Sequence, residues 1–267
     1  MRDPYPAGRR SAYWFTAAAA LLALTGCGSS GSGGDAPPAG GPTSTSATGA
    51  PVRDKGPECA GTDSEGSVHV LRGGGFVLPG GGGVQYAAAT ADGRTRTATL
   101  RDGASYQDGQ AARTVAPGGR IAVSGHTYRV AQVCSYRVVL VPQDAAARTA
   151  LAAAPASMKA VGGRADAGLC FSTGAAVRAA ASDGFPPKGS AWTLSNNGGR
   201  RLLPTGWSAA LYSVDATAGT AVIRANCAAI PVAAYKQAAV GDTLEFAGAT
   251  FKVTSLTPTA AVLTRTA

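Results

Sequence analysis

The stretch GGRIAVSGHTYRVAQVCSYRVVLV, residues 118–141, decides the fold, because the chain contains a related stretch further on. A shift of 123 positions carries it onto GDTLEFAGATFKVTSLTPTAAVLT, residues 241–264. Apolar residues recur at alternate positions in both stretches, which is typical of half-buried β-strands. A slip of one residue would send every side chain to the opposite face, so the shared alternation indicates two related β units.

The correspondence continues upstream of these stretches. The same shift places Gly83 on Gly206, Asp92 on Asp215 and residues 97–101 on residues 220–224. We therefore predict an all-β protein with two tandem antiparallel repeats, each a small sandwich or barrel, derived from an internal duplication. The repeats cover 58–141 and 181–267, and an Ala-rich connector with a short helix, 142–180, joins them.

Six short strands are expected in the first repeat, with turns marked by Asp92-Gly93 and Ser124-Gly125. Their approximate ranges are 67–71, 84–90, 95–101, 121–123, 128–133 and 137–141. The Gly-rich stretch 72–83 reads as a mobile connection between strands, and 102–117 as a loop or short helix. The apolar residues that share the even positions of the central hairpin are expected in the core: Val84, Tyr86, Ala98 and Leu100.

Two helical segments are predicted. Asp144 is a suitable N-cap for a helix that extends to Ala154, with Pro155 as its stop. Residues 231–238 predict one or two further helical turns in the second repeat, because Pro231 suits a first helical position.

Four cysteines, Cys59, Cys134, Cys170 and Cys227, remain after Cys27 is set aside. An even number in an exported chain favours two disulfides, and four cysteines allow three pairings. We favour Cys59–Cys134 and Cys170–Cys227. The sequence has no CxxC motif that would indicate a zinc or redox site.

Residues 1–26 have the organisation of an export signal, with Arg9 and Arg10 before the apolar stretch 17–24. The segment ends in Leu24-Thr25-Gly26-Cys27, which resembles the lipobox of bacterial lipoproteins. That resemblance implies cleavage before Cys27, lipidation of its thiol and attachment to the outer face of the cell membrane, since two acyl chains suffice for stable anchoring. Residues 27–57, rich in Gly, Ser, Thr and Pro, then predict a disordered tether.

The chain is basic, with a net charge of +9. Nucleic acid is not expected as a partner of an exported protein. Arg94, Arg96 and Arg101 lie close together on one hairpin, which makes them candidates for contact with acidic lipid headgroups or wall polymers. The competing interpretation is a solvated edge strand whose charges prevent pairing with other chains.

Motifs for catalysis or cofactor binding are missing from the sequence. His69 and His126 have no second histidine at ligand spacing, and there is no GxSxG elbow. The acidic group 63–65 lacks the further oxygen ligands of a calcium loop. The glycine runs 73–75 and 80–83 match neither phosphate-loop pattern. We therefore expect no cofactor and no metal.

A combined pattern is present in the two repeats. Residues 71–75 match LRxGG, and residues 241–253 match GD-x-apolar-x-apolar-x-G-x-x-Tyr/Phe-x-Val. The pattern resembles that of short β domains of unknown function in actinobacteria. The resemblance covers 58–141 and 181–264, and the first copy has Gly118-Gly119 where the pattern has Gly-Asp. It implies a fold but no activity and no site residues.

Two classes of function remain open. The first is a non-enzymatic envelope lipoprotein that binds an envelope protein or acidic wall polymer, or acts structurally. The second is an envelope-acting hydrolase, or a lipoprotein that binds a small ligand between the repeats near Trp192 and Trp207. The chain has few of the histidines and clustered acids that hydrolysis needs, so the first class is favoured. Both tryptophans are expected in the core.

Overall fold

A computed structural model describes residues 56–78, 82–91, 95–153, 170–171, 173, 187–203 and 207–267. All of these residues belong to the same compact unit of the chain. The expectations for the export signal 1–26, Cys27, Arg94 and most of the tether lie outside the described residues. Within the described ranges, no helix has the length and apolar character needed to cross a membrane.

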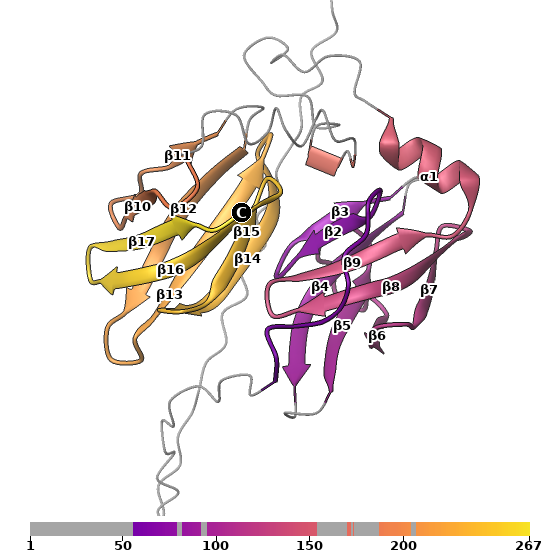
Figure 1. The fold of residues 1–267 in the computed structure, drawn as a ribbon, viewed down its shortest axis with the longest axis horizontal. Helices are drawn as coiled ribbons and strands as arrows, with labels where there is room; N and C mark the ends of the chain where they lie inside the picture. The colour runs from indigo at the N-terminus through magenta and orange to yellow at the C-terminus, as the bar shows by residue number, and fades with distance from the viewer. Residues whose placement is uncertain are drawn as a thin grey trace, which may run out of the picture. The chain divides into compact units, whose positions relative to one another are not determined.

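The first half of the described chain, residues 56–142, forms two antiparallel sheets (Figure 1). One has the order β1-β8-β9-β2, with β7 paired to β8, and the other has the order β3-β4-β5-β6. The strands are β1 (Cys59–Gly61), β2 (Val68–Leu71), β3 (Gly75–Val77), β4 (Gly83–Ala91), β5 (Arg96–Asp102), β6 (Ala112–Val115), β7 (Arg120–Val123), β8 (His126–Cys134) and β9 (Arg137–Pro142).

The second half, residues 187–267, also forms two antiparallel sheets, with the orders β10-β17-β16-β15 and β11-β12-β13-β14. Its strands are β10 (Ala191–Ser195), β11 (Arg201–Leu202), β12 (Trp207–Asp215), β13 (Thr220–Cys227), β14 (Ile230–Ala239), β15 (Thr243–Phe246), β16 (Ala249–Thr257) and β17 (Ala260–Arg265). The all-β prediction is confirmed, and within the described residues the sheets are open layers rather than a closed barrel.

The core of the first half lies between its two sheets. Val84 and Tyr86 on β4 and Ala98 and Leu100 on β5 are all buried, as their shared position in the alternation predicts. The Tyr86 hydroxyl donates to the carbonyl of Cys134 on the opposite sheet at 2.6 Å, so this buried phenol is satisfied. The two sheets are therefore fixed to each other by apolar packing and by one buried hydrogen bond.

The strands of the two halves correspond in order and pairing. β7, β8 and β9 have the same bounds as β15, β16 and β17 after the shift of 123. Ser124 (φ 49°) and Ala247 (φ 50°) take the same left-handed conformation in the turns that follow β7 and β15. Common descent of the halves stays a prediction, but the same local structure is built twice.

The shift of 123 positions also places His69 on Trp192, and here the sequence match differs from the structure by one residue. Trp192 pairs with Leu263 on β17, whereas the equivalent Leu140 on β9 pairs with Val68. Val68 therefore takes the core place of Trp192, and His69 lies on the outer face of its sheet. A one-residue shift between β2 and β10 explains the difference, because it moves every side chain to the other face.

Three local predictions were also wrong. Residues 230–239 form strand β14, not helical turns. Register shifts along β13 and β14 interrupt the alternation, so the buried residues Val232, Ala233, Tyr235 and Ala238 follow a helix-like spacing in the sequence. Strands β3 and β6 lie in stretches that were expected to be connections.

The predicted helix is present as α1 (Ala145–Ala152). Asp144 is its N-cap, and its Oδ1 accepts from the backbone N–H of Ala147 at 2.7 Å. Ala147 and Leu151 are the buried residues of the helix and join the core of the first half. The helix therefore closes one end of that core.

Candidate functional site

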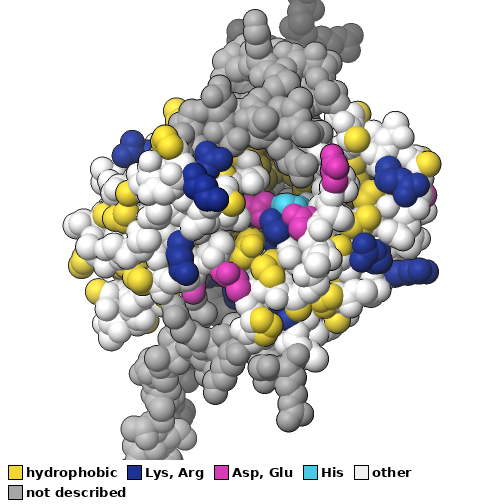
Figure 2. All heavy atoms as spheres, in the orientation of Figure 1, with side chains coloured by type: hydrophobic (Ala, Val, Ile, Leu, Met, Phe, Trp, Pro, Cys, Tyr) yellow, Lys and Arg dark blue, Asp and Glu magenta, His cyan; other side chains and the backbone are white. Residues whose placement is uncertain are grey.

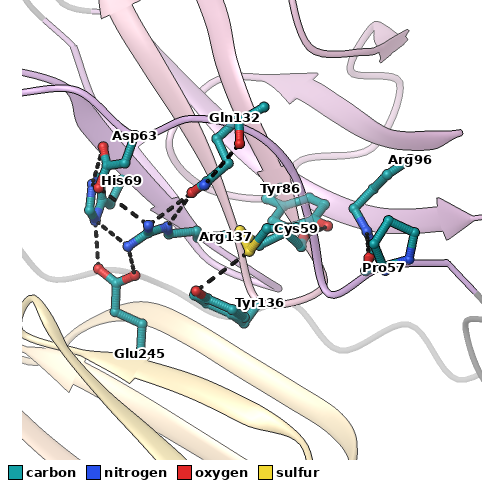
Figure 3. Close-up of a disulfide and its surroundings, with 12 residues drawn as sticks. Pro57, Cys59, Asp63, His69, Tyr86, Arg96, Gln132, Tyr136, Arg137 and Glu245 are labelled. Atoms are coloured by element: carbon teal, nitrogen blue, oxygen red, sulfur yellow. Dashed lines mark hydrogen bonds and ion pairs between the residues drawn. A yellow bond between two sulfur atoms is a disulfide. The ribbon is translucent and has the colours of Figure 1, made fainter. Parts of the chain in front are cut away.

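Four charged side chains from distant parts of the chain meet at one place, shown in Figure 3. Asp63 lies in the loop after β1, His69 on β2, Arg137 at the start of β9 and Glu245 on β15. We name these four residues the ion cluster. Figure 2 shows acidic, basic and histidine side chains gathered in the middle of the face in view.

Each cation of the ion cluster contacts both carboxylates. His69 Nδ1 lies 2.7 Å from Glu245 Oε1, and His69 Nε2 lies 3.0 Å from Asp63 Oδ2. Arg137 Nη1 lies 2.9 Å from Glu245 Oε2, and Arg137 Nη2 lies 3.2 Å from Asp63 Oδ2. With a protonated imidazole the two positive and two negative charges cancel, which is the arrangement that makes burial of charge tolerable.

The position of Glu245 follows from the alternation of β15. Leu244 and Phe246 face the core of the second half, so Glu245 points outward from its own sheet. Glu245 is nevertheless only 1% exposed, because residues of the first half cover it. Ala122 holds the same place on β7 and is exposed, so the ion cluster is specific to the contact between the two halves.

The pKa values identify the protonation states. Burial by itself lowers the pKa of His69, but Glu245 and Asp63 outweigh burial and raise that pKa to about 9. Burial raises the pKa of Glu245, yet His69 and Arg137 hold it below its ordinary value. His69 therefore carries both ring protons at neutral pH and has no lone pair to accept a proton. The ion cluster therefore forms an ionic joint between the two halves.

Further hydrogen bonds orient the members of the ion cluster. Gln132 Oε1 accepts from Arg137 Nε at 3.2 Å and from Nη2 at 2.8 Å. The Ser67 hydroxyl donates to Asp63 Oδ1 at 2.9 Å. The backbone of Glu245 is held by the buried Tyr235 hydroxyl, which donates to its carbonyl and accepts from its N–H. These contacts restrict each charged group to one geometry, which a buried polar network requires.

The backbones of the two halves also meet beside the ion cluster. The N–H of Ala234 on β14 donates to the carbonyl of Arg72 at 2.8 Å. A Cβ on Gly73 or Gly74 would collide with the backbone of Ala234 or Val232, so this approach requires glycine. Leu71, Cys134 and Tyr136 of the first half pack in the core of the second half. The contact is thus apolar, hydrogen-bonded and ionic at once.

The chain enters the first half next to this contact, at residues 57–59, which we name the entry joint. Arg96 Nε donates to the carbonyl of Pro57 at 2.6 Å. The N–H of Ser135 donates to the carbonyl of Glu58 at 2.9 Å. Cys59 forms a disulfide with Cys134 (Figure 3). Three different interactions therefore hold three consecutive residues.

Both favoured disulfides are present. Cys59 and Cys134 are partners across β1 and β8. Cys170 pairs with Cys227 at the end of β13. Phe171, next to Cys170, packs against the cores of both halves. The second bridge thus ties a residue of the connector to the second half.

Of the three arginines proposed as a basic surface, Arg94 lies outside the described residues and Arg96 is buried. Arg96 is only 2% exposed and faces inward with Ala98 and Leu100. Its charge is used at the entry joint, so the expectation of an anionic contact is wrong for this residue. Arg101 is partly exposed, and its guanidinium lies against the ring of Tyr106.

Other residues considered from the sequence have structural places. His126 Nδ1 lies 3.1 Å from the Asp144 carboxylate at the start of α1. Trp192 and Trp207 are buried in the core of the second half, as expected. Among the described residues, no group of three His, Cys, Asp or Glu side chains is arranged to hold a metal ion. Of the acidic group 63–65, Asp63 belongs to the ion cluster.

No family model, no characterised protein and no solved structure matches this chain. Its function is therefore inferred from its residues and their geometry.

Proposed function

We propose that this protein is a non-enzymatic lipoprotein of the outer face of a bacterial cell membrane, where it acts as a binding or structural module. Cys27 carries the lipid, and residues 27–57 form the tether to the folded part. The observation that carries the proposal is the entry joint. Pro57 at the end of the tether sequence, and Glu58 and Cys59 directly after it, are each fixed to the folded body.

A domain held by a lipid receives any pull through the first residues of its fold. Strand β1 has three residues and lies at the edge of its sheet. Backbone hydrogen bonds of so short an edge strand open easily. The Cys59–Cys134 disulfide makes the attachment of β1 covalent. The buried guanidinium of Arg96 holds Pro57, which lies two positions before Cys59. This reinforcement is what a tethered domain needs at the point of load.

The ion cluster supports a role in which the folded part presents a binding surface of fixed geometry. It joins the halves through two ion pairs, in which the buried Glu245 contacts His69 and Arg137. Asp63 adds two further ion pairs to the same cations within the first half. Neutral pH leaves all four groups charged, so their contact holds one arrangement of the halves. A body of fixed geometry presents its surface without paying the entropy of ordering it on binding.

The test is the state of Cys27 in cells that process lipoproteins. Mass spectrometry of the peptide that begins at Cys27 is expected to find an N-terminal diacylglyceryl modification, and fractionation is expected to place the protein with the membrane. A Cys27→Ser variant is the control and is expected in the soluble exported fraction. An unmodified Cys27 peptide, or membrane retention of the Ser variant, overturns the proposal.

A further inference from the structure

One arginine takes the same place in both halves and meets a tyrosine in each. Arg101 on β5 and Arg224 on β13 correspond under the shift of 123. The Arg101 guanidinium lies 5.2 Å from the ring centroid of Tyr106, and that of Arg224 lies 4.2 Å from the ring centroid of Tyr212. Both distances are within the range of cation–π contact.

The two tyrosines do not correspond in the sequence, so the same arrangement is built by different means. Tyr212 lies at the register shift of β12, between Leu211 and Ser213. A bulge of this kind turns a side chain away from the alternation of its strand. At the equivalent shift on β4 the residue between Tyr86 and Ala88 is Ala87, which presents no ring.

Tyr106 is instead presented by the loop between β5 and β6. Gln85 Nε2 donates to the carbonyl of Gly103 at 3.0 Å, and Gln110 Nε2 donates to that of Ser105 at 2.7 Å. The Tyr106 hydroxyl donates to Asp108 Oδ1 at 2.9 Å. These bonds organise the loop before any ligand arrives, which lowers the entropy cost of binding.

Both tyrosines remain exposed to solvent beside the guanidinium that they contact. Tyr106 is 63% exposed and Tyr212 is 48% exposed. In the described part of the chain, no carboxylate forms an ion pair with Arg101 or Arg224. Each site thus offers an exposed aromatic ring beside a cation without an acidic partner.

We propose that the pairs Arg101–Tyr106 and Arg224–Tyr212 are two contact points for an acidic polysaccharide of the cell envelope. The C–H face of a sugar ring packs on the exposed ring of the tyrosine, and the guanidinium binds the carboxylate of that sugar or its neighbour. This inference rests on the proposed function, because the lipid tether is what places the folded part beside such a polymer.

The charge pattern fits a polysaccharide better than an anionic lipid surface. Each contact point pairs one arginine with one tyrosine ring. This ratio matches a polymer in which each sugar ring carries one carboxylate. Figure 2 shows Lys and Arg side chains at several separate places on the face in view, whereas lipid-binding surfaces concentrate basic residues.

The experiment measures binding of the purified full-length chain by isothermal titration calorimetry. Polygalacturonate supplies sugar rings with carboxylates, dextran supplies sugar rings without charge, and polyphosphate supplies charge without rings. Vesicles of phosphatidylglycerol test the lipid alternative. The variants are the double change Tyr106→Ala/Tyr212→Ala, the double change Tyr106→Phe/Tyr212→Phe, and Arg120→Ala. The last removes one charge from an exposed arginine outside both pairs.

The wild-type chain is expected to bind polygalacturonate and not dextran. The Ala double variant is expected to bind polygalacturonate about tenfold more weakly, since truncation of exposed aromatic contacts has effects of this size. The Phe double variant keeps the rings and is expected to bind as the wild type does. Arg120→Ala is expected to change the affinity less than threefold.

Four results overturn the proposal: no binding of polygalacturonate, no loss in the Ala double variant, an equal loss in the Phe double variant, or binding of the vesicles in preference to polygalacturonate. Circular dichroism of each variant shows whether the fold is retained, and the tyrosines are exposed, so folding is not at risk. The acyl mass of the Cys27 peptide, measured on the same preparations, tests the anchor separately from the binding.

Discussion

Arg137 and Glu245 are 108 positions apart in the chain, yet Arg137 Nη1 donates to Glu245 Oε2 at 2.9 Å. One residue belongs to β9 of the first half and the other to β15 of the second. Glu245 also faces the protonated ring of His69 at 2.7 Å. A single buried carboxylate thus balances two cations of the other half, and its removal has a predictable cost.

A Glu245→Gln variant keeps the size of the side chain and removes its charge. His69 and Arg137 then retain only Asp63, which is 37% exposed, as a counter-charge. We expect the free energy of unfolding at neutral pH to fall by about 3 kcal/mol, as in other buried ion pairs that lose one partner. Urea denaturation followed by tryptophan fluorescence measures this. Glu65→Gln, at an exposed site in the nearby loop, is the control and is expected to change stability by less than about 0.5 kcal/mol. A similar small change in Glu245→Gln contradicts the ionic joint.

The stability of the protein is expected to fall in mild alkali because of His69. Its pKa rises from 6.5 to about 9 on folding, so its contribution is complete below the lower value and is lost as pH rises through the higher one. Between about pH 7 and about pH 9.5 the wild type is expected to lose about 2 kcal/mol from this group. His69→Gln lacks the titrating ring and is expected to lose less over the same interval. Equal losses in the two proteins, measured by urea denaturation, count against this assignment.

Acid is expected to weaken the same contact through its other members. The pKa values of Glu245 and Asp63 are both lower in the folded protein than their ordinary values. Their contribution is therefore present above those ordinary values and fades as pH falls below them. The ion cluster stabilises the contact most in the interval between the titration of its acids and that of His69.

Much of the fold could be predicted because it depends on local pattern. Alternation identified the core residues of the central hairpin, and Ser124-Gly125 marked a turn that the structure contains. The same alternation held a signal that the sequence interpretation missed: Arg96 shares the positions of Ala98 and Leu100 and therefore points inward. Its cluster with other arginines in the sequence suggested a surface that the strand geometry does not allow.

The ion cluster could not be predicted because its partners come from the two halves. In LEF, residues 244–246, Glu245 reads as an ordinary solvent-facing position between two core residues. Its burial depends on how the second half contacts His69 and Arg137, and no periodicity encodes that contact. Strand β14 was missed because Pro231 suggested the start of a helix. Proline is also found near the start of an edge strand, and that is where Pro231 lies.

The Cys59–Cys134 bridge is expected to hold β1 in place. The double change Cys59→Ala/Cys134→Ala removes a cross-link that spans 75 positions, which corresponds to about 4 kcal/mol of stability. Hydrogen exchange of Ala60 and Gly61 is expected to become faster, because hydrogen bonds alone then hold β1 and its flanking residues. The double change Cys170→Ala/Cys227→Ala is the control, with a similar loss of stability and unchanged exchange at these residues. Unchanged exchange in the first variant contradicts the role of the entry joint.

Gly73 is expected to be irreplaceable at the contact between the halves. It has a φ of 70°, and an added Cβ would collide with the carbonyl of Ala234 on β14. Gly66 has a similar φ of 72°, with open space where a Cβ would lie. Gly66→Ala is therefore expected to cost about 1 kcal/mol from conformation alone. Gly73→Ala is expected to cost at least twice as much by urea denaturation, because the halves must also separate. Equal costs for the two changes rule out close packing as the reason for Gly73.

The turn between β13 and β14 is expected to be a site where substitution raises the stability of the protein. Ala228 and Ala229 connect the paired residues Cys227 and Ile230 with φ angles of 48° and 67°. Two-residue hairpin turns with both φ values positive strongly favour Asn-Gly, whereas alanine is strained there. The double change Ala228→Asn/Ala229→Gly is expected to raise the free energy of unfolding by about 1 kcal/mol. Ala218→Gly alters a turn residue that is not left-handed, and it is expected to give no gain. Thermal denaturation of the wild type and of both variants measures the change in stability. Equal stability of the two variants contradicts the idea that Ala228 and Ala229 are strained.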